Sequence, residues 1–242
     1  MRNRVILLTL TAIAFLLSTA CINPPAGDAE VMAPNQILDF DVLYKQNCAG
    51  CHGLGGRNGV AIALADPVFL AIADDATIHR TATNGVRGTP MPAFAQSAGG
   101  PLTDKQIDVL VRGVRSWANS TPVAPAEIPP YAPKSAGDPE RGAAVFRTYC
   151  SSCHGENGKG GKAGSVVDSS FLALVSDQEL RLNVILGRPA AGAPDWRNDT
   201  PGHPMAEQEI SDVVAWLAAQ RTETPGQPYP ISAMQPTSGG IR

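Results

Sequence analysis

The chain has 242 residues, a formal net charge of −3, 43% hydrophobic residues and only 5% aromatic residues. This length suits two modest domains better than one large core, and the weak acidity without a basic stripe argues against a nucleic-acid-binding protein. Because large rings are scarce, the cores need another bulky apolar component to reach normal packing density.

Residues 1–20 have the pattern of an export signal, with a basic start, an apolar run over residues 5–17 and small residues at 18–20. The apolar run is too short for the roughly 30 Å hydrocarbon core of a bilayer. Cys21 follows directly, which resembles the lipobox of bacterial lipoproteins, although Ser18 stands where that motif usually has leucine. The resemblance implies a lipid anchor on Cys21 at the periplasmic side of a bacterial membrane. The alternative is simple secretion.

Three stretches rich in proline, alanine and glycine divide the rest of the chain. We expect residues 21–36 to form a tether, residues 119–137 a linker and residues 222–242 a tail, because such compositions cannot bury a core. Two predicted domains remain, at residues 37–118 and 138–221.

The two domains are predicted to be copies of one unit. A shift of 102 residues aligns the sequence CAGCH at 48–52 with CSSCH at 150–154, and matches continue without a gap to Gly85 and Gly187. A register of this length is far more specific than the short motif, so we infer an internal duplication.

Each copy is predicted to contain a helix that runs into the cysteine motif, a short helix ended by glycine, and a final amphipathic helix. No stretch alternates as a strand does, so the predicted fold class is all-α, with two small domains in tandem. The expected helices cover residues 40–51, 75–85 and 102–118 in the first copy, and residues 138–153, 176–187 and 205–221 in the second.

The C-x-x-C-H motifs predict two covalently bound haems c. Cysteines three residues apart at a helix end project to one side, where their sulfurs can add to the porphyrin vinyl groups, and the next histidine lies beneath the iron. The attachment residues would be Cys48, Cys51, Cys150 and Cys153, and the iron ligands His52 and His154.

Three alternatives to haem attachment fit the motifs less well. A four-cysteine zinc site uses pairs roughly 15–20 residues apart and has no use for the histidine, and a thioredoxin-like pair needs a βαβ context. A disulfide is possible in an exported chain but does not account for His-Gly after both pairs. Four thioethers and Cys21 account for all five cysteines.

A sixth iron ligand is expected from the loop before each final helix. Met91 lies between two prolines, and Met205 also follows a proline. In the second copy the histidine-to-methionine spacing is longer, which we explain by an insertion over residues 187–199. His203 is therefore a rival to Met205, and core packing is the alternative role for either methionine.

Both halves resemble class I cytochrome c domains. The resemblance rests on an aromatic residue four positions before the first cysteine, the C-x-x-C-H motif, the methionine loop and an aromatic residue on the last helix; the aromatics are Tyr44, Phe146, Trp117 and Trp216. The family implies that the first and last helices cross at a small residue. Gly142 fits this position, whereas Phe40 at the equivalent position does not. The family also often has a proline whose carbonyl accepts from the ligating histidine. Val60 and Ser165 stand near that place here, so the partner of each histidine ring N–H is left open.

An iron with both axial positions filled passes single electrons and has no open site for a substrate. The resemblance therefore implies electron transfer, without catalysis, in a bacterial respiratory or photosynthetic chain. The expected partners are a quinol-oxidising complex upstream and a terminal oxidase or photosynthetic reaction centre downstream, and the chain would act as tethered carrier or complex subunit. The alternative is a peroxidase-like dihaem oxidoreductase whose second haem is open or bound by His203.

Two arginines near the predicted methionine loops, Arg87 and Arg188, are candidate partners for the haem propionates. Solvated surface arginines are the alternative interpretation.

Overall fold

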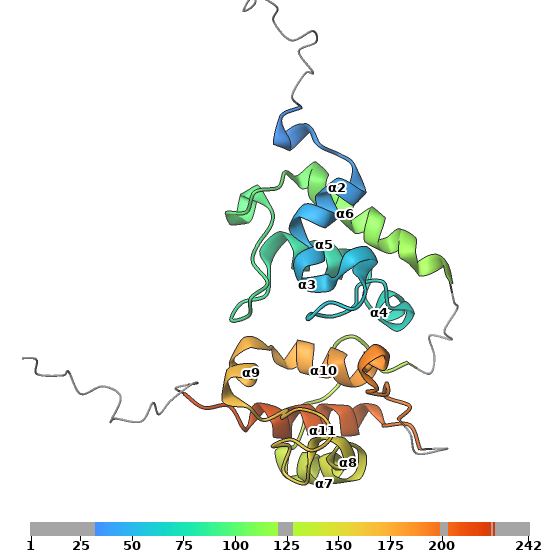
Figure 1. Cartoon of the computed structure of the whole chain (residues 1–242), viewed down its shortest axis with the longest axis vertical. Coiled ribbons are helices and arrows are strands. Elements are labelled where there is room, and N and C mark those ends of the chain that lie inside the picture. Colours follow the sequence, from blue (N-terminus) through green and yellow to red (C-terminus); the bar gives the residue numbers. More distant parts are fainter. Residues whose placement is uncertain (1–31, 121–127, 199–202, 224, 226–242) are drawn as a thin grey trace, which may run out of the picture. The chain divides into compact units, whose positions relative to one another are not determined.

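The computed structural model describes residues 32–120, 128–198, 203–223 and 225 (Figure 1). These ranges contain helices and two isolated backbone bridges but no strand, which confirms the predicted all-α class for the described chain. No helix within them is long and apolar enough to span a membrane. The predicted export signal, Cys21 and most of the predicted tail lie outside the described residues.

The helices form two sets that follow the same order along the chain. The first set is α2 (Phe40–Asn47), α3 (Ala49–His52), α4 (Pro67–Ile72), α5 (Asp75–Asn84) and α6 (Asp104–Ser116). The second set is α7 (Pro139–Tyr149), α8 (Ser151–His154), α9 (Ser169–Leu174), α10 (Asp177–Leu186) and α11 (Glu207–Ala218). In both sets the last helix packs against the first helix and against the helix before it.

The helix ends follow their local sequence. Asp138 caps α7 by accepting hydrogen bonds from two backbone N–H groups, and Thr103 forms a capping box with Gln106 at the start of α6. Helices α5 and α10 end at Gly85 and Gly187, whose φ angles of +66° and +61° are strained for other residues. These caps confirm the predicted helix ends at Asp138, Thr103, Gly85 and Gly187. The helices predicted over residues 40–51 and 138–153 are each interrupted, at Cys48 and at Cys150.

In the second domain, α7 and α11 cross at Gly142. A Cβ atom there would lie 2.0 Å from the carbonyl oxygen of Asp212 and 2.7 Å from the Cβ of Trp216. Only glycine permits this approach, because the nearest obstacle is backbone. The predicted small residue at the crossing is confirmed for this domain.

In the first domain the large residue of this crossing lies on the first helix and the small residue on the last helix, the reverse of the second domain. Phe40 occupies the position of Gly142, and its ring lies against Gly113 of α6, where a Cβ atom would be 2.0 Å from the ring. The last helices α6 and α11 start 103 residues apart, so Gly113 corresponds to Trp216. The small residue that the cytochrome c resemblance implied on the first helix is therefore found on the last helix.

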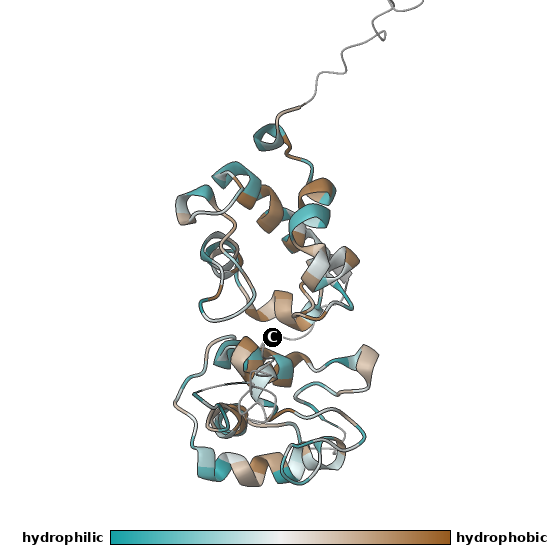
Figure 2. Ribbon diagram, turned by 60° about the vertical axis from the view of Figure 1, so that its left-hand side comes forward, coloured by the Kyte–Doolittle hydropathy of each residue, from teal (hydrophilic) through white to brown (hydrophobic). Residues whose placement is uncertain are grey.

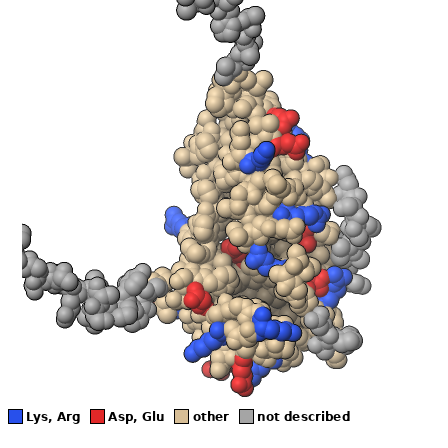
Figure 3. Space-filling model, in the orientation of Figure 1, with Lys and Arg blue, Asp and Glu red and all other residues tan. Residues whose placement is uncertain are grey.

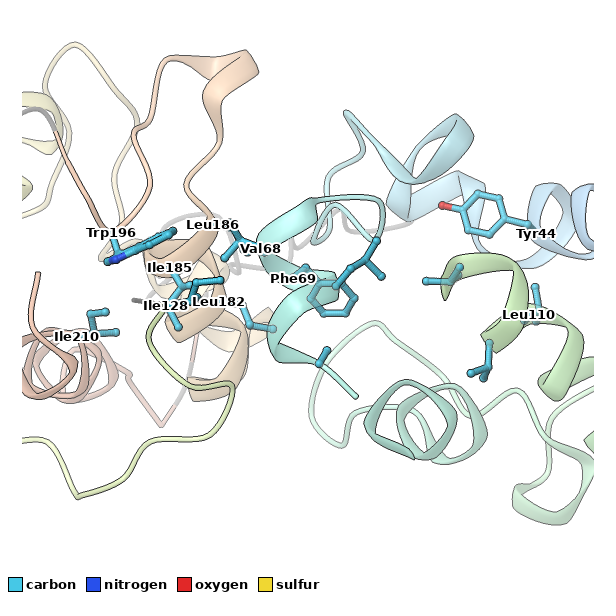
Figure 4. Packing of buried hydrophobic residues seen from close by; sticks show 14 of the residues in the cluster. Tyr44, Val68, Phe69, Leu110, Ile128, Leu182, Ile185, Leu186, Trp196 and Ile210 are labelled. Carbon is cyan, nitrogen blue, oxygen red and sulfur yellow. The ribbon is translucent and has the colours of Figure 1, made fainter. Parts of the chain in front are cut away.

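The helices carry both hydrophobic and hydrophilic residues (Figure 2), and the cores are built from matched positions of the last helices. The buried residues are Ile107, Leu110, Val111 and Val114 on α6, and Ile210, Val213, Val214 and Leu217 on α11. Aromatic rings complete each core: Tyr44 lies 5.0 Å from Trp117, and Phe146 lies 4.4 Å from Trp216, between ring centroids. Figure 4 labels Tyr44 of α2 and Leu110 of α6 in this core.

In each domain one arginine near or after the end of the last helix stabilises a corner between two short helices, α4 and α5 in the first domain and α9 and α10 in the second. Each arginine donates to one backbone carbonyl within the helix before the corner, to one at the end of that helix, and to the aspartate at which the next helix begins. The donors are Arg115 and Arg221, and the acceptors are Leu70, Ala73 and Asp75 in the first domain and Leu172, Val175 and Asp177 in the second. The acceptors are 102 residues apart, whereas Arg221 comes about one helical turn later than the counterpart of Arg115.

The later part of the predicted linker packs on the second domain. Arg181 of α10, only 2% exposed, donates to the carbonyls of Pro130 and Tyr131 and pairs with Glu207 at 3.2 Å. Glu207 also accepts from the backbone N–H of Lys134. A buried charge persists only where it is paired and hydrogen-bonded, so this cluster fixes residues 128–137 to α10 and α11. Residues 121–127 lie outside the described chain.

Candidate haem-attachment and axial sites

The first C-x-x-C-H motif spans the break between α2 and α3. The backbone N–H groups of Cys51 and His52 donate to the carbonyl of Cys48, which winds the motif into a single turn. Gly53, with φ +81°, ends this turn, and a Cβ atom there would lie 1.8 Å from the carbonyl oxygen of Arg57. The hydroxyl of Tyr44 donates to the carbonyl of Gly53 at 3.0 Å, so the aromatic residue before the motif supports its far end.

The second motif repeats this geometry. Cys153 and His154 donate to the carbonyl of Cys150, and Gly155, with φ +77°, ends α8. None of the four motif cysteines forms a disulfide within the described chain. Burial, reinforced by the neighbouring cysteine, raises the pKa of Cys48 and of Cys150 to about 11, so both remain protonated at neutral pH in the absence of haem.

Both motif histidines are oriented by a backbone carbonyl ten residues later. The Nδ1 atom of His52 lies 2.7 Å from the carbonyl oxygen of Ile62, and that of His154 lies 2.8 Å from the carbonyl oxygen of Gly164. A carbonyl only accepts, so Nδ1 is the donor, and in a neutral ring with this tautomer the lone pair lies on Nε2. Burial lowers the pKa of His52, while the bond to Ile62 opposes that shift.

These carbonyls are functional groups that sequence reasoning placed only approximately, near Val60 and Ser165. The signal was weak because a carbonyl acts through the backbone, and its residue type carries no information. Two cysteine sulfurs and an imidazole whose Nδ1 is already hydrogen-bonded, all on one helical turn, are the donor set that a covalent haem c requires. The residues of each motif therefore fit the group.

Met91 lies in a tight loop after α5. The backbone N–H of Val86 donates to the carbonyl of Met91 at 3.0 Å, and the N–H of Met91 donates to the Thr89 hydroxyl. Gly85 allows the loop to return close to the helix, since a Cβ atom there would lie 2.5 Å from Pro92. Met91 is half-buried on this fixed loop.

The structure corrects the expected insertion in the second copy. The N–H of Arg188 donates to the carbonyl of Ala193, as Val86 does to Met91, and Gly187 lies against Pro194 as Gly85 lies against Pro92. The shift of 102 residues therefore continues through this loop. The histidine-to-methionine spacing was misleading because it counted to a methionine at a different structural position.

Met205 takes the structural position of Leu102. The N–H of Met205 donates to the carbonyl of Trp196, and the N–H of Leu102 donates to that of Phe94, both at 2.8 Å. Both side chains are 6% exposed and belong to the buried core. By this register Met205 and Met91 occupy different positions of their loops, although their proline contexts agree, and ligation of the second iron by Met205 stays a prediction. His203 is exposed, and its carbonyl accepts from Asn198 at 2.7 Å.

The two candidate propionate partners differ in their surroundings. Arg87 is exposed on the Met91 loop. Arg188 is also exposed, and its guanidinium donates to the carbonyls of Gly59 and Val60 at 2.7 and 3.0 Å. Propionate contact by either residue stays a prediction.

The loops that follow the two motifs have different surfaces. In the first, Leu54 and Val60 are 76% and 79% exposed. Residues at the equivalent positions of the second loop are Glu156 and Lys162. The face shown in Figure 3 carries acidic and basic side chains interspersed, so no large field of one sign dominates it.

Both halves of the chain match known protein families. Residues 35–112 match the family described as cytochrome c oxidase, cbb3-type, subunit III, and residues 139–221 match the family described as cytochrome c.

Individual relatives extend the match. The chain is 31% identical to the cbb3-type cytochrome c oxidase subunit CcoP of Azospirillum sp. (strain B510) over 57% of its own length and 47% of the relative. It is 30% identical to the cbb3-type subunit FixP of Rhizobium meliloti (strain 1021), over 59% of its length and 50% of the relative. The chain thus spans about half the length of these relatives. A cytochrome bc1 complex cytochrome c subunit of Corynebacterium diphtheriae is 23% identical over 91% of this chain and 81% of the relative.

Proposed function

We propose that this chain, which consists of two cytochrome c domains in tandem, transfers single electrons through its two covalently bound haems c in a bacterial respiratory or photosynthetic chain. One haem is attached to Cys48 and Cys51, with His52 on the iron. The other is attached to Cys150 and Cys153, with His154 on the iron.

The orientation of the two histidines is the observation that carries this proposal. Each Nδ1–H is committed to a carbonyl, so each Nε2 is held ready for a metal at the end of a turn that also presents two thiols. Such an outer hydrogen bond fixes the ring orientation and increases the basicity of the ligand.

Met91 supports electron transfer rather than catalysis at the first haem. Its loop is held by the Val86 bond and by the close approach of Gly85 to Pro92. A histidine and a thioether fill both axial positions, and the thioether favours the ferrous state, which raises the reduction potential.

The relatives suggest the place of the chain in electron flow. CcoP and FixP are named as subunits of a terminal oxidase, and the Corynebacterium protein as a subunit of a cytochrome bc1 complex. We place this chain between a quinol-oxidising complex and a terminal acceptor such as an oxidase or photosynthetic reaction centre. It would be exported and held at the periplasmic side of the membrane by a lipid on Cys21, as a tethered carrier or as a complex subunit.

The first experiment counts haems and couples in the purified full chain. We expect a pyridine haemochrome spectrum that gives two haems c per chain and a potentiometric titration with two reversible one-electron couples. The matched control, Cys150→Ser with Cys153→Ser, should retain one haem and the higher-potential couple. Fewer than two haems in the wild type, or couples that do not reverse, would contradict the proposal.

The membrane attachment is tested separately by mass spectrometry of the mature N-terminus. A diacylglycerol adduct on Cys21 that is lost in Cys21→Ser is expected. An unmodified N-terminus in the membrane fraction would contradict the anchor and leave electron transfer unaffected.

A further inference from the structure

We infer that the second haem has no methionine ligand and that its sixth position is open to a small exogenous ligand, with carbon monoxide as the diagnostic probe. This inference rests on the proposed attachment of a haem to each motif. It assigns to the second domain a ligand-binding site that the first domain lacks.

Ala193 occupies the place of the missing thioether. Four features of the Met91 loop recur in the second domain at a constant shift of 102 residues. They are Gly85 with its positive φ, Pro92 that this glycine approaches, the hydrogen bond from the N–H of Val86 to the carbonyl of Met91, and the aromatic residue Phe94. Their counterparts are Gly187, Pro194, the bond from Arg188 to Ala193, and Trp196. Ala193, half-buried as Met91 is, therefore stands where the thioether should be.

Met205 occupies a core position instead. It shares with Leu102 the backbone bond to the preceding aromatic residue, the 6% exposure and the place directly before the cap of the last helix. The matched residues of α6 and α11 extend this register. A methionine at a leucine position of a core packs as an apolar side chain.

Recruiting Met205 to the iron would disrupt the packing around it. Its N–H is bonded to Trp196, whose own N–H donates to Ile185 of α10. Two residues later, Glu207 is held by Arg181 and by the N–H of Lys134. Moving the Met205 side chain would open a hole in a packed core while both flanks remain tied.

Among the described residues near the loop, Asp195 is engaged elsewhere and His203 is exposed. The carboxylate of Asp195 accepts from the guanidinium of Arg197, and His203 is exposed with its carbonyl bound by Asn198. Alanine offers no lone pair. The second haem thus keeps the His154 ligand and presents its opposite face to water or to a diatomic molecule, at a lower reduction potential than the first haem.

The test is a carbon monoxide titration of the reduced full chain, combined with the weak methionine-to-iron band of the oxidised protein. The wild type is expected to bind one carbon monoxide per chain and to show the band of a single methionine-ligated haem. Ala193→Met should abolish carbon monoxide binding and double the band, and Met91→Ala should double carbon monoxide binding and remove the band.

Two further variants keep the inference falsifiable if Ala193→Met disturbs the loop. Met205→Leu, which copies position 102, should change neither the band nor the carbon monoxide stoichiometry, and neither should His203→Ala. A wild type with two methionine bands, one of them lost in Met205→Leu, would overturn the inference. So would a wild type that binds carbon monoxide only after His203→Ala. A chain with two haems and no carbon monoxide binding would overturn the open site and leave electron transfer standing, whereas a missing second haem would overturn the proposed function itself.

Discussion

The first and second domains share a backbone plan and differ in the side chains that occupy it. The histidine carbonyls, the loop after α5 or α10 and the acceptors of the corner arginines all recur at a shift of 102 residues. At the helix crossing, however, Phe40 and Gly113 are replaced by Gly142 and Trp216, and in the loop Met91 is replaced by Ala193. The duplicated domains thus share hydrogen-bonded backbone positions, whereas the residues at the helix crossing and in the loop differ.

The largest expected effect comes from the helix crossing. Gly142→Ala should lower the free energy of unfolding of the second domain by about 3 kcal/mol, because its Cβ would meet the backbone of α11, which cannot move aside. Gly113→Ala should cost only about 1 kcal/mol, because the Phe40 ring can tilt. Thermal unfolding of the holoprotein measures both.

The control for the crossing is Gly50→Ala, where a Cβ atom meets nothing within 4 Å. This variant should unfold as the wild type does. If Gly142→Ala and Gly113→Ala lowered the free energy of unfolding equally, the two crossings would be equivalent. That result would contradict the different packing described for the two glycines.

A smaller effect is expected at Asp212, which the first domain replaces by a valine at position 109. This carboxylate is 3% exposed and accepts from Arg141, Gln208 and the N–H of Asp138. The bond from Arg141 is the main cause of its lowered pKa. Asp212→Asn should cost about 2 kcal/mol at pH 7.

The pH dependence of that cost has a defined sign. A carboxyl whose pKa is lower in the folded state stabilises the protein above its unfolded pKa of about 4, and the contribution disappears as the pH falls through the folded value. The gap between wild type and Asp212→Asn should therefore be full at neutral pH and shrink below about pH 4. Denaturant unfolding at several pH values measures it, and a gap that persists in acid would show that packing, not charge, is responsible.

The corner arginines should have similar effects in both domains. Arg115→Gln and Arg221→Gln each leave helix-end carbonyls and an aspartate without their charged donor, and we expect about 1 kcal/mol for each. Calorimetry of the two single variants and the double variant measures the costs. A cost confined to one domain would indicate that the displaced Arg221 is not a functional counterpart of Arg115.

The smallest effect on stability is expected at the loops after the motifs. Leu54→Glu with Val60→Lys copies the second loop onto the first and should change the free energy of unfolding by less than about 0.5 kcal/mol, since both side chains are exposed. Reduction of the first haem by a charged redox partner should become more dependent on ionic strength. Stopped-flow rates at two salt concentrations test this, and an unchanged salt dependence would exclude the loop from the docking surface.

Local chemistry was readable from the residues alone. The C-x-x-C-H motifs, the caps at Asp138 and Thr103 and the amphipathic last helices each depend on neighbours within a few positions, so the all-α fold and both haem attachments followed from the chain as printed. The duplication supported these predictions because two copies carried the same features in one register.

The axial and crossing positions needed the folded chain. Ile62 and Gly164 act through backbone carbonyls, which no residue type announces, and Phe40 and Gly113 meet across a crossing between helices far apart in sequence. The same holds for Met205, since a thioether suits an iron or a core equally well. The backbone hydrogen bond from Met205 to Trp196 matches the bond from Leu102 to Phe94 and therefore assigns Met205 to a core position. Sequence spacing alone does not show which residues of the two loops are equivalent.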